Sequence, residues 1–381
     1  MDAASTYQIT LPTKVFFGPG ERRRLSEEAG RIGGRAFVMV DPFLKETPVE
    51  RGVLASLSQA GVSASLWHDI VPNPRAGTCD RAAAELVEAG ATMIVALGGG
   101  STMDAAKAVA LVAANGGTSW DYTARAGAQV RQPERRGIPL IAIPTNAGTG
   151  AEITPFAVLS HPDLHLKATI IHPFCFPDVA LIDPDLHRTK PRRLTASTGV
   201  DTFLHAFEGY IGTRPSGWTD LFSLRAMELT AEWLPRACDD GADIEARTRM
   251  AEACYMAGIT LGAIGVGIPH ALGQALGALK DTPHGESCAA FLVETVRWTH
   301  PVAADRLATV AGFFGGGDLA GRLSGFFDRI GLDARLSRLG LARDETGRLL
   351  DIAEANYGFD IACSRKPAGR ADLEAIVAAS F

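Results

Sequence analysis

Four short apolar runs in the first half of the chain limit most strongly what it can fold into. The runs are rich in β-branched residues and end in Gly, Pro or Asp, as buried strands do. Segments 49–61 and 79–90 instead repeat apolar residues at helical spacing and stop at Gly. Strands that alternate with helices predict a parallel α/β sheet. The predicted strands are RAFVMVD (35–41), ATMIVALGGG (91–100), GIPLIAIPT (137–145) and DVALID (178–183).

The second half of the chain shows a different pattern. After LIDPDL (181–186) no run reads as a strand, and segments such as 220–237 and 245–262 show helical periodicity. A chain of 381 residues is long enough for two domains. We therefore predict an α/β domain over residues 1–186 and an all-helical domain over residues 187–381. A cleft between such domains is a usual place for a ligand.

Charge and hydropathy argue against two classes of partner. The net charge of −6 is spread without long like-charge runs, which favours neither nucleic acid nor an anionic membrane. No apolar stretch reaches the roughly 20 residues of a membrane span, and the N-terminal segment lacks a signal-peptide pattern. The six cysteines form no CxxC pair, which is typical of reduced thiols. We expect a cytoplasmic protein without a nucleic-acid or membrane partner.

A glycine-rich loop follows the second predicted strand. Gly98, Gly99, Gly100 and Ser101 lie between that strand and a helical segment. Glycines let backbone N–H groups approach a ligand closely, and the helix N-terminus behind them favours an anion such as the pyrophosphate of a dinucleotide. The alternative is a tight strand-to-helix turn, because the loop does not match the usual GxGxxG fingerprint.

A second loop, IPTNAGTGAE (143–152), follows the third predicted strand and carries Thr145 and Thr149. Two loops behind neighbouring parallel strands open at the same edge of the sheet, which favours a nucleotide site. Asp41 ends the first strand, where a carboxylate can bind the adenosine ribose and favour NAD(H) over NADP(H). Its alternative role is to start a turn, since Asp-Pro commonly does so.

Four side chains in the second half suit a metal ion. Asp201 and His205 are four residues apart and share a face on a helix. Pro269 fits the first turn of a helix that carries His270, and His284 lies in a predicted Pro-His-Gly turn. The alternatives are buried or turn histidines, and an Asp201 that stabilises a first helical turn capped by Thr198.

Together these four residues offer one carboxylate and three imidazoles, with no competing cysteine. Such a set suits Fe2+ or Zn2+ with a position open for substrate. Two interpretations of Cys288 remain, a thiol near this site or a buried inert thiol, and we favour the second.

Long motifs in this order resemble the iron-containing (group III) alcohol dehydrogenase family. They are GGGSTMDAAKA, IPTNAGTGAE, DVALIDPDL, TASTGVDTFLHAFEGY and PHALGQALGALKDTPHG. The resemblance implies a dehydroquinate synthase-like architecture, with an N-terminal NAD(P)-binding domain followed by a helical metal-binding domain. It also implies a divalent metal, with Fe2+ favoured over Zn2+, and a homodimer paired through the N-terminal segment.

Several residues of this chain match family positions. By that match, the metal ligands are Asp201, His205, His270 and His284, and Asp41 goes with NAD preference. The resemblance further implies cofactor contacts at Gly98, Gly99, Gly100, Ser101, Asp104, Thr145, Thr149 and Lys167. The implied activity is metal-dependent hydride transfer between the nicotinamide of NAD(P)(H) and a metal-bound alcohol or carbonyl, with a small alcohol or aldehyde as substrate.

Gln274 departs from the family pattern, in which a histidine often stands one turn after His270 and assists at the nicotinamide side. Glutamine does not titrate, so it cannot relay a proton. Three interpretations remain at this point: the proton leaves through water or a cofactor hydroxyl, Gln274 binds a particular substrate, or activity on ordinary alcohols is poor. The fourth is that Gln274 is an inconsequential polar residue.

Two other enzyme classes share this architecture. A lyase resembling dehydroquinate synthase needs several Lys and Arg around a phosphorylated substrate, but the segment GITLGAIGVGIPH (258–270) before the metal motif is small and apolar. A metal-free reductase resembling maleylacetate reductase lacks the metal ligands, whereas all four candidates are present here. We therefore expect an alcohol dehydrogenase or aldehyde reductase.

Overall fold

The structure, a computed structural model, describes residues 8–381 of the chain, which divide into two compact units. The α/β unit contains residues 11–146 and 151–188. The helical unit contains residues 189–381 together with residues 8–10 and the short segment 147–150.

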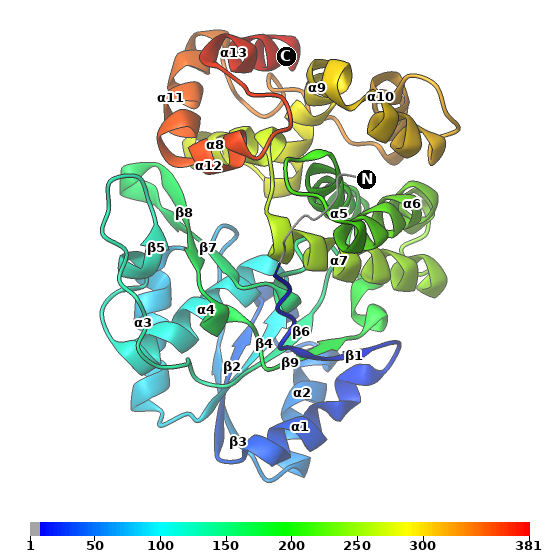
Figure 1. Ribbon diagram of the computed structural model, residues 1–381. Helices are drawn as coiled ribbons and strands as arrows, with labels where there is room; N and C mark the ends of the chain where they lie inside the picture. The colour runs from blue at the N-terminus through cyan, green and yellow to red at the C-terminus, as the bar shows by residue number, and fades with distance from the viewer. Residues whose placement is uncertain (1–7) are drawn as a thin grey trace. The chain divides into compact units, whose positions relative to one another are not determined.

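The α/β unit is built on a six-stranded sheet in which every pairing is parallel. Its strand order is β1-β9-β6-β4-β2-β3 (Figure 1). The four predicted apolar runs form β2, β4, β6 and β9, so the predicted parallel sheet is confirmed. The strands are β1 (Lys14–Phe17), β2 (Arg35–Val40), β3 (Ser63–Trp67), β4 (Met93–Gly98), β6 (Leu140–Pro144) and β9 (Val179–Ile182).

Helices cover both faces of this sheet. Helices α1 (Leu25–Ile32) and α2 (Pro48–Gln59) share one apolar core with Val38 of β2, while α3 (Ala76–Glu88) and α4 (Gly100–Asn115) share another with Met39. Because successive side chains of a strand point to opposite faces, a strand between two helical layers is apolar throughout. This explains the uninterrupted apolar runs.

A second, three-stranded antiparallel sheet, with the order β5-β8-β7, was not predicted from the sequence. Its β7 packs on α4. Lys107 of α4 is buried there, and its ammonium donates to the carbonyls of Thr154 and Phe156 over 2.9 and 2.7 Å. The strands are β5 (Thr123–Ala124), β7 (Phe156–His161) and β8 (Leu166–Ile171).

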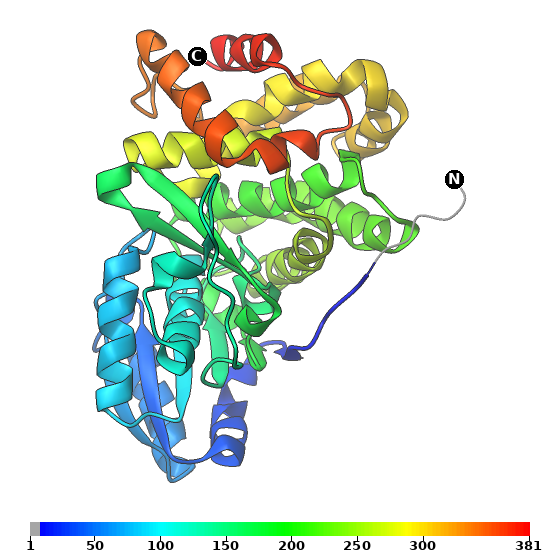
Figure 2. The same cartoon turned by 60° about the vertical axis from the view of Figure 1, so that its left-hand side comes forward.

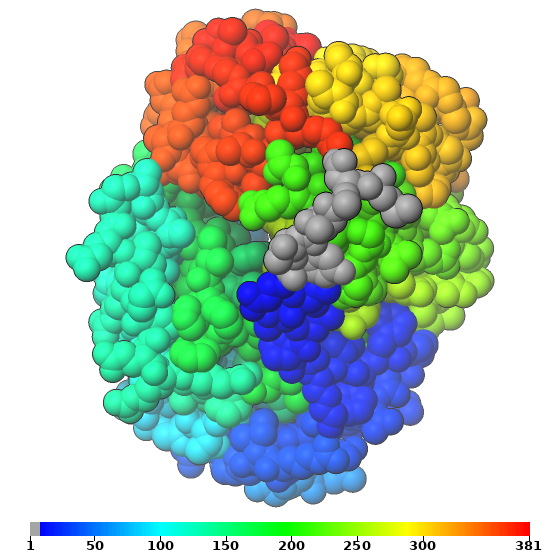
Figure 3. Space-filling view, viewed as in Figure 1, coloured from blue at the N-terminus to red at the C-terminus, as the bar shows by residue number. Residues whose placement is uncertain are grey.

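The helical unit has no strand among its described residues. Its central helix α5 packs on α6, α7 and α9, and α8 packs on α9 and α11 (Figures 1 and 2). Helices α9 to α13, coloured yellow to red, form one continuous surface of this unit (Figure 3). The helices are α5 (Arg192–Ile211), α6 (Gly217–Asp239), α7 (Ile244–Ile264), α8 (Ile268–Lys280), α9 (His284–Gly312), α10 (Leu319–Ile330), α11 (Thr346–Asn356), α12 (Gly358–Ala362) and α13 (Arg370–Ala379).

In the described part of the chain, no single helix has both the length and the apolar character to cross a bilayer. The pair α7 and α8 has them in combination, but the two helices are bent by 96°.

Two helix boundaries differ from those predicted. Helix α5 begins at Arg192 after Pro191, so Thr198 lies inside the helix, where its hydroxyl donates to the carbonyl of Leu194. The capping role considered for Thr198 and Asp201 is therefore wrong. His284 does not lie in a turn, because it is the first residue of α9 and Pro283 is the N-cap.

The segment 147–150 is held by α5 and α7 of the helical unit. The amide of Gly148 donates to Cys254 Sγ over 3.0 Å, and the hydroxyl of Thr202 donates to the Gly148 carbonyl over 3.2 Å. Gly150 has a φ of +61°, and a Cβ there would lie 2.7 Å from the Cα of Gly258. Close backbone packing therefore requires glycine at this position.

Candidate metal centre and cofactor loops

Helix α5 brings three acidic or imidazole side chains to one face. Asp201, His205 and Glu208 are spaced by four and three residues, which places them on consecutive turns of the same stripe. Every residue of α5 from Gly199 to Ile211 is buried. Polar side chains on such a helix need partners inside the protein, because burial without partners is costly.

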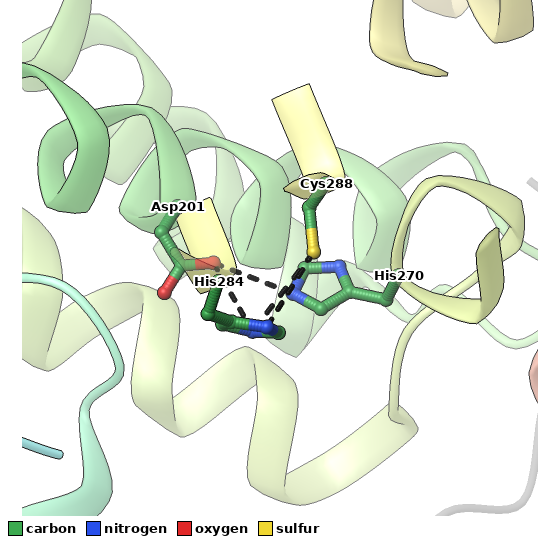
Figure 4. Close-up of side chains that lie close together, drawn as sticks. All are labelled: Asp201, His270, His284 and Cys288. Atoms are coloured by element: carbon green, nitrogen blue, oxygen red, sulfur yellow. Dashed lines mark hydrogen bonds and ion pairs between the residues drawn. The ribbon is translucent and has the colours of Figure 1, made fainter. Parts of the chain in front are cut away.

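The histidines of α8 and α9 meet this face of α5. His270 lies in the first turn of α8, after Pro269, as predicted. His284 begins α9, and α8 packs directly on α9. Figure 4 shows Asp201, His270 and His284 pointing towards one another from three different helices.

The distances within this cluster suit a shared ion better than hydrogen bonds. Asp201 Oδ1 lies 3.5 Å from His270 Nε2, 3.6 Å from His284 Nε2 and 3.9 Å from His205 Nε2. Two atoms bound to a tetrahedral ion at about 2.1 Å are separated by about 3.4 Å, whereas N–H···O bonds are near 2.9 Å. Asp201 Oδ1 therefore lies near the distance expected for shared metal ligation from one nitrogen of each predicted histidine ligand.

Three buried atoms in the cluster have no hydrogen-bond partner among the described residues. They are Asp201 Oδ1, His270 Nε2 and His205 Nδ1, and the three residues are only 2–3% exposed. A buried polar atom without a partner costs about 1–3 kcal/mol, so native proteins rarely leave one unsatisfied. A cation among these donors would satisfy Asp201 Oδ1 and His270 Nε2, and the residues present thus fit a metal ion.

The electrostatics of the cluster favour positive charge. Burial alone would raise the pKa of Asp201, but His205, His284 and His270 outweigh it and hold that pKa well below its usual range. Burial likewise would lower the pKa of His270, yet Glu208 and Asp201 raise it to about 10. Because a metal ion must displace protons from such donors, its binding should strengthen as pH rises.

Glu208 is a functional candidate that the sequence analysis missed. One carboxylate oxygen lies 2.6 Å from His270 Nδ1, and the other accepts from the amide of Gly267 over 2.5 Å. A carboxylate on Nδ1 fixes the ring so that Nε2 faces the metal. Its position seven residues after Asp201, on the same helical stripe, was the signal that could have revealed it.

Cys288 lies at the site, which was the less favoured of its two interpretations, and it corrects the expectation that no cysteine competes there. It lies on α9 one turn after His284, and its Sγ is 3.7 Å from His284 Nδ1. One ligand atom from each of Asp201, His270, His284 and Cys288 lies within 4.8 Å of the others. The sequence analysis placed His284 in a turn. In a turn, the spacing of four residues between His284 and Cys288 does not indicate a shared helix face.

Gln274 lies on α8, four residues after His270 and therefore on the same side of the helix. It is 8% exposed, and its Oε1 accepts no hydrogen bond from any described residue. A free, buried carbonyl oxygen lies one helical turn from a predicted metal ligand.

The first predicted cofactor loop is tightly packed within the α/β unit. A Cβ on Gly98 would lie 2.1 Å from the hydroxyl of Thr102 and 3.0 Å from the Cβ of Asp41, and one on Gly99 would lie 2.6 Å from Asn146 Nδ2. The amide of Thr145 donates to the carbonyl of Gly98 over 2.9 Å. Asp41 and Thr145 therefore lie beside the glycines at the carboxyl ends of β2, β4 and β6.

Helix α4 begins at Gly100, and Ser101 follows in its first turn. Its N-cap, Gly99, makes no side-chain cap, and the first turn carries no acidic residue. Backbone N–H groups at a helix N-terminus bind anions such as phosphate. The pyrophosphate contact of this loop stays a prediction.

The other three predicted cofactor residues lie elsewhere. Asp104 of α4 accepts from the amide of Val158 on β7 over 3.1 Å, and burial raises its pKa to about 6. Lys167 of β8 donates to Asn73 over 2.7 Å. Thr149 lies in segment 147–150, which belongs to the helical unit.

Comparison with known proteins gives consistent matches along the chain. A family profile described as iron-containing alcohol dehydrogenase matches residues 12–184, and one for the C-terminal part of the Fe-containing alcohol dehydrogenase family matches residues 195–379. The chain is 31% identical to long-chain-alcohol dehydrogenase 1 of Geobacillus thermodenitrificans, across 99% of this chain and 97% of that protein. It is 34% identical to choline dehydrogenase of Bacillus subtilis, across 81% and 77%.

Solved structures with the same fold include two oxidoreductases. Sulfoacetaldehyde reductase from Bifidobacterium kashiwanohense, in complex with NAD+, has a TM-score of 0.90 at 27% identity and is covered to 99%, as is this chain. A 1,3-propanediol oxidoreductase has a TM-score of 0.93 at 26% identity, with 99% of this chain and 100% of that chain covered.

Proposed function

We propose that this chain, a metal-dependent alcohol dehydrogenase of the iron-containing alcohol dehydrogenase family, interconverts a small alcohol and its aldehyde. In this proposal NAD(H) is the cofactor. Residues 1–186 bind the dinucleotide in this proposal. Residues 187–381 hold one divalent ion, for which the family name indicates Fe2+, through Asp201, His205, His270 and His284. The metal-free reductase and the lyase are not favoured, because both family profiles describe alcohol dehydrogenases.

The observation that carries this proposal is the convergence of Asp201 Oδ1 with three imidazole Nε2 atoms at 3.5–3.9 Å, in a buried setting that leaves Asp201 Oδ1 and His270 Nε2 without partners. In the oxidative direction, an alcohol loses a hydride to NAD+ and a proton to solvent, which yields aldehyde, NADH and H+. When bound, the ion supplies Lewis-acid polarisation of the substrate oxygen and the nicotinamide accepts the hydride.

The protein's own residues then position the reacting groups. Glu208 orients His270, and α5 holds Asp201 and His205 on one rigid face. His284, with 33% of its side chain exposed, is the most accessible of the four predicted ligands. We therefore place substrate entry at the side of the centre that His284 borders.

The test of this proposal measures metal and turnover on the same protein, purified anaerobically without chelator. Elemental analysis should give about one Fe or Zn per chain, as for a single catalytic site. NADH absorbance should change with an aldehyde panel in proportion to metal content. Protein that binds NAD and turns over aldehyde fully without any metal would overturn the proposed centre.

The preference for NAD(H) is expected to depend on Asp41. Its carboxylate would repel the 2′-phosphate of NADP(H), and like charges in contact cost several kcal/mol. In Asp41→Ser, the ratio of kcat/KM for NADP+ to that for NAD+ should rise about 10- to 100-fold. Asp69→Ser, which removes an exposed carboxylate from the same unit, should leave the ratio unchanged. An unchanged ratio in both variants would contradict this role of Asp41.

We further propose that the free Oε1 of Gln274 accepts a hydrogen bond from the substrate. A buried acceptor without a partner favours ligands that bring a donor, because the complex then regains the lost hydrogen bond. Substrates with a second hydroxyl or amine beside the reacting carbon would provide one. The proton released by oxidation must leave by another route, since glutamine does not titrate.

Gln274→Leu tests this role with an internal control. We expect kcat/KM for ethane-1,2-diol to fall about 10- to 100-fold, equivalent to 1–3 kcal/mol, while that for ethanol stays within about twofold. The melting temperature should not fall, because the variant removes a buried acceptor that has no partner in the protein. Equal losses on both alcohols would show that Gln274 does not discriminate between them.

Two further assignments complete the proposal. Strand β1 is an edge strand of the larger sheet, with one side not paired within the described chain, and we propose that it pairs with a second copy in a homodimer. None of the six cysteines, which all lie in the described part of the chain, forms a disulfide, and this suits a reducing compartment such as the cytoplasm.

A further inference from the structure

The side chain of Cys288 is directed into the candidate metal centre. It lies four residues after His284 on α9, so both side chains share one face of the helix. Its Sγ is 3.7 Å from His284 Nδ1 and 3.9 Å from Nε2, and the residue is fully buried. Figure 4 shows the sulfur beside the rings of His270 and His284.

Helix α8 leaves room for this sulfur. A Cβ on Gly273 would lie 2.5 Å from Cys288 Sγ and 2.8 Å from its Cα. Any larger residue at 273 would push the thiol, and α9 with it, away from α8. The glycine therefore lets the sulfur lie close to His270, which is one turn earlier on the same helix.

The distances match a mixed sulfur and nitrogen coordination. An ion with bonds of about 2.3 Å to sulfur and about 2.1 Å to nitrogen, in tetrahedral geometry, separates those two atoms by about 3.6 Å. The observed Sγ-to-His284 distances of 3.7 and 3.9 Å are close to this value. Ligand atoms of Asp201, His270, His284 and Cys288 are also mutually within 4.8 Å, a set that does not contain His205.

We propose that the thiolate of Cys288 is a ligand of the metal ion, together with Asp201, His270 and His284. This inference rests on the proposed function, which assigns a metal to the same centre. On binding, the thiol S–H bond breaks, its proton leaves to solvent and the sulfur donates an electron pair to the ion, with no change of oxidation state. His205 Nε2 stays 3.9 Å from Asp201 Oδ1, so Cys288 adds a donor to the four already proposed.

A thiolate changes which metal the centre selects. Soft sulfur ligands favour Zn2+, whereas sites of carboxylate and imidazole alone discriminate less against Fe2+. The family name indicates iron, but this chain should therefore load Zn2+ in preference to Fe2+ when both are offered.

X-ray absorption spectroscopy of the zinc-loaded full-length protein tests the ligation directly. The wild type should show a sulfur neighbour at about 2.3 Å beside nitrogen and oxygen at 2.0–2.2 Å. Cobalt-loaded protein should show a thiolate charge-transfer band. Both signals should vanish in Cys288→Ala and Cys288→Ser, but persist in Cys238→Ala, which removes a buried sulfur from the same apolar core.

Competitive loading gives a second readout. The ratio of bound Zn2+ to bound Fe2+ should fall at least about tenfold in Cys288→Ser, since the soft ligand is lost. A wild-type zinc centre with only nitrogen and oxygen neighbours would overturn the role of Cys288 and leave the proposed metal function intact. Failure of the wild type to bind any of the three ions would overturn both.

Discussion

Replacing His270 with alanine is expected to abolish metal binding and to lower kcat/KM for alcohols by at least about 10³-fold. The loss follows because metal polarisation of the substrate oxygen supplies several kcal/mol of transition-state stabilisation. The variant also leaves Glu208 without the imidazole that now lies 2.6 Å from its carboxylate, and Asp201 without a neighbour at 3.5 Å. Elemental analysis and NADH absorbance on the same sample measure both effects.

His300→Ala is the matched control for this variant. His300 is an exposed histidine on α9, the helix that also carries His284. It should retain wild-type metal content and activity. A His270→Ala protein that keeps its ion and turns over alcohol at the wild-type rate would remove His270 from the centre.

Glu208→Gln should weaken metal binding about 10- to 100-fold, the usual effect of changing a partner that orients a metal ligand. The amide keeps the shape of the side chain, but its single oxygen cannot accept from both His270 Nδ1 and the Gly267 amide. Competition against a chelator measures the dissociation constant. Activity should return at high metal concentration, because Glu208 positions a ligand and is not one itself.

Glu252→Gln serves as the control for Glu208, because its carboxylate pairs with Arg249 on α7 instead of with a predicted ligand. The control should bind metal as the wild type does. Excess metal should not restore His270→Ala. If Glu208→Gln bound metal with wild-type affinity, then orientation of His270 by Glu208 would contribute nothing to the centre.

The strands that could be predicted from the sequence are those covered by helices on both faces of the larger sheet. Strand β2 is apolar at every position after Arg35, and burial between two helical layers explains this pattern. Strand β3 is mostly exposed at the sheet edge, and β7 and β8 pair with each other away from the main sheet. The apolar residues of β3 and β8 are interrupted by polar ones, and β7 has an apolar run of only four residues, Phe156 to Leu159, which the sequence analysis did not assign to a strand.

In the candidate centre, too, some residues could be predicted from the sequence and others could not. The shared face of Asp201 and His205 follows from helical spacing within one element. The approach of His270 and His284 to that face depends on how α8 and α9 pack, which no local pattern contains. The position of Cys288 beside His284 could not be predicted without the start of α9. The two residues share a face of the helix only because α9 begins at His284.

The segment 147–150 limits where two homologous chains can be joined to make a chimeric protein. A chimera joined at residue 186 would take Gly148 and Gly150 from one parent, and Thr202, Cys254 and Gly258 from the other. These residues meet through two hydrogen bonds and one backbone contact that tolerates only glycine. Successful exchange of cofactor-binding halves between homologues therefore requires that these four loop residues travel with the helical half, although they lie far from it in sequence.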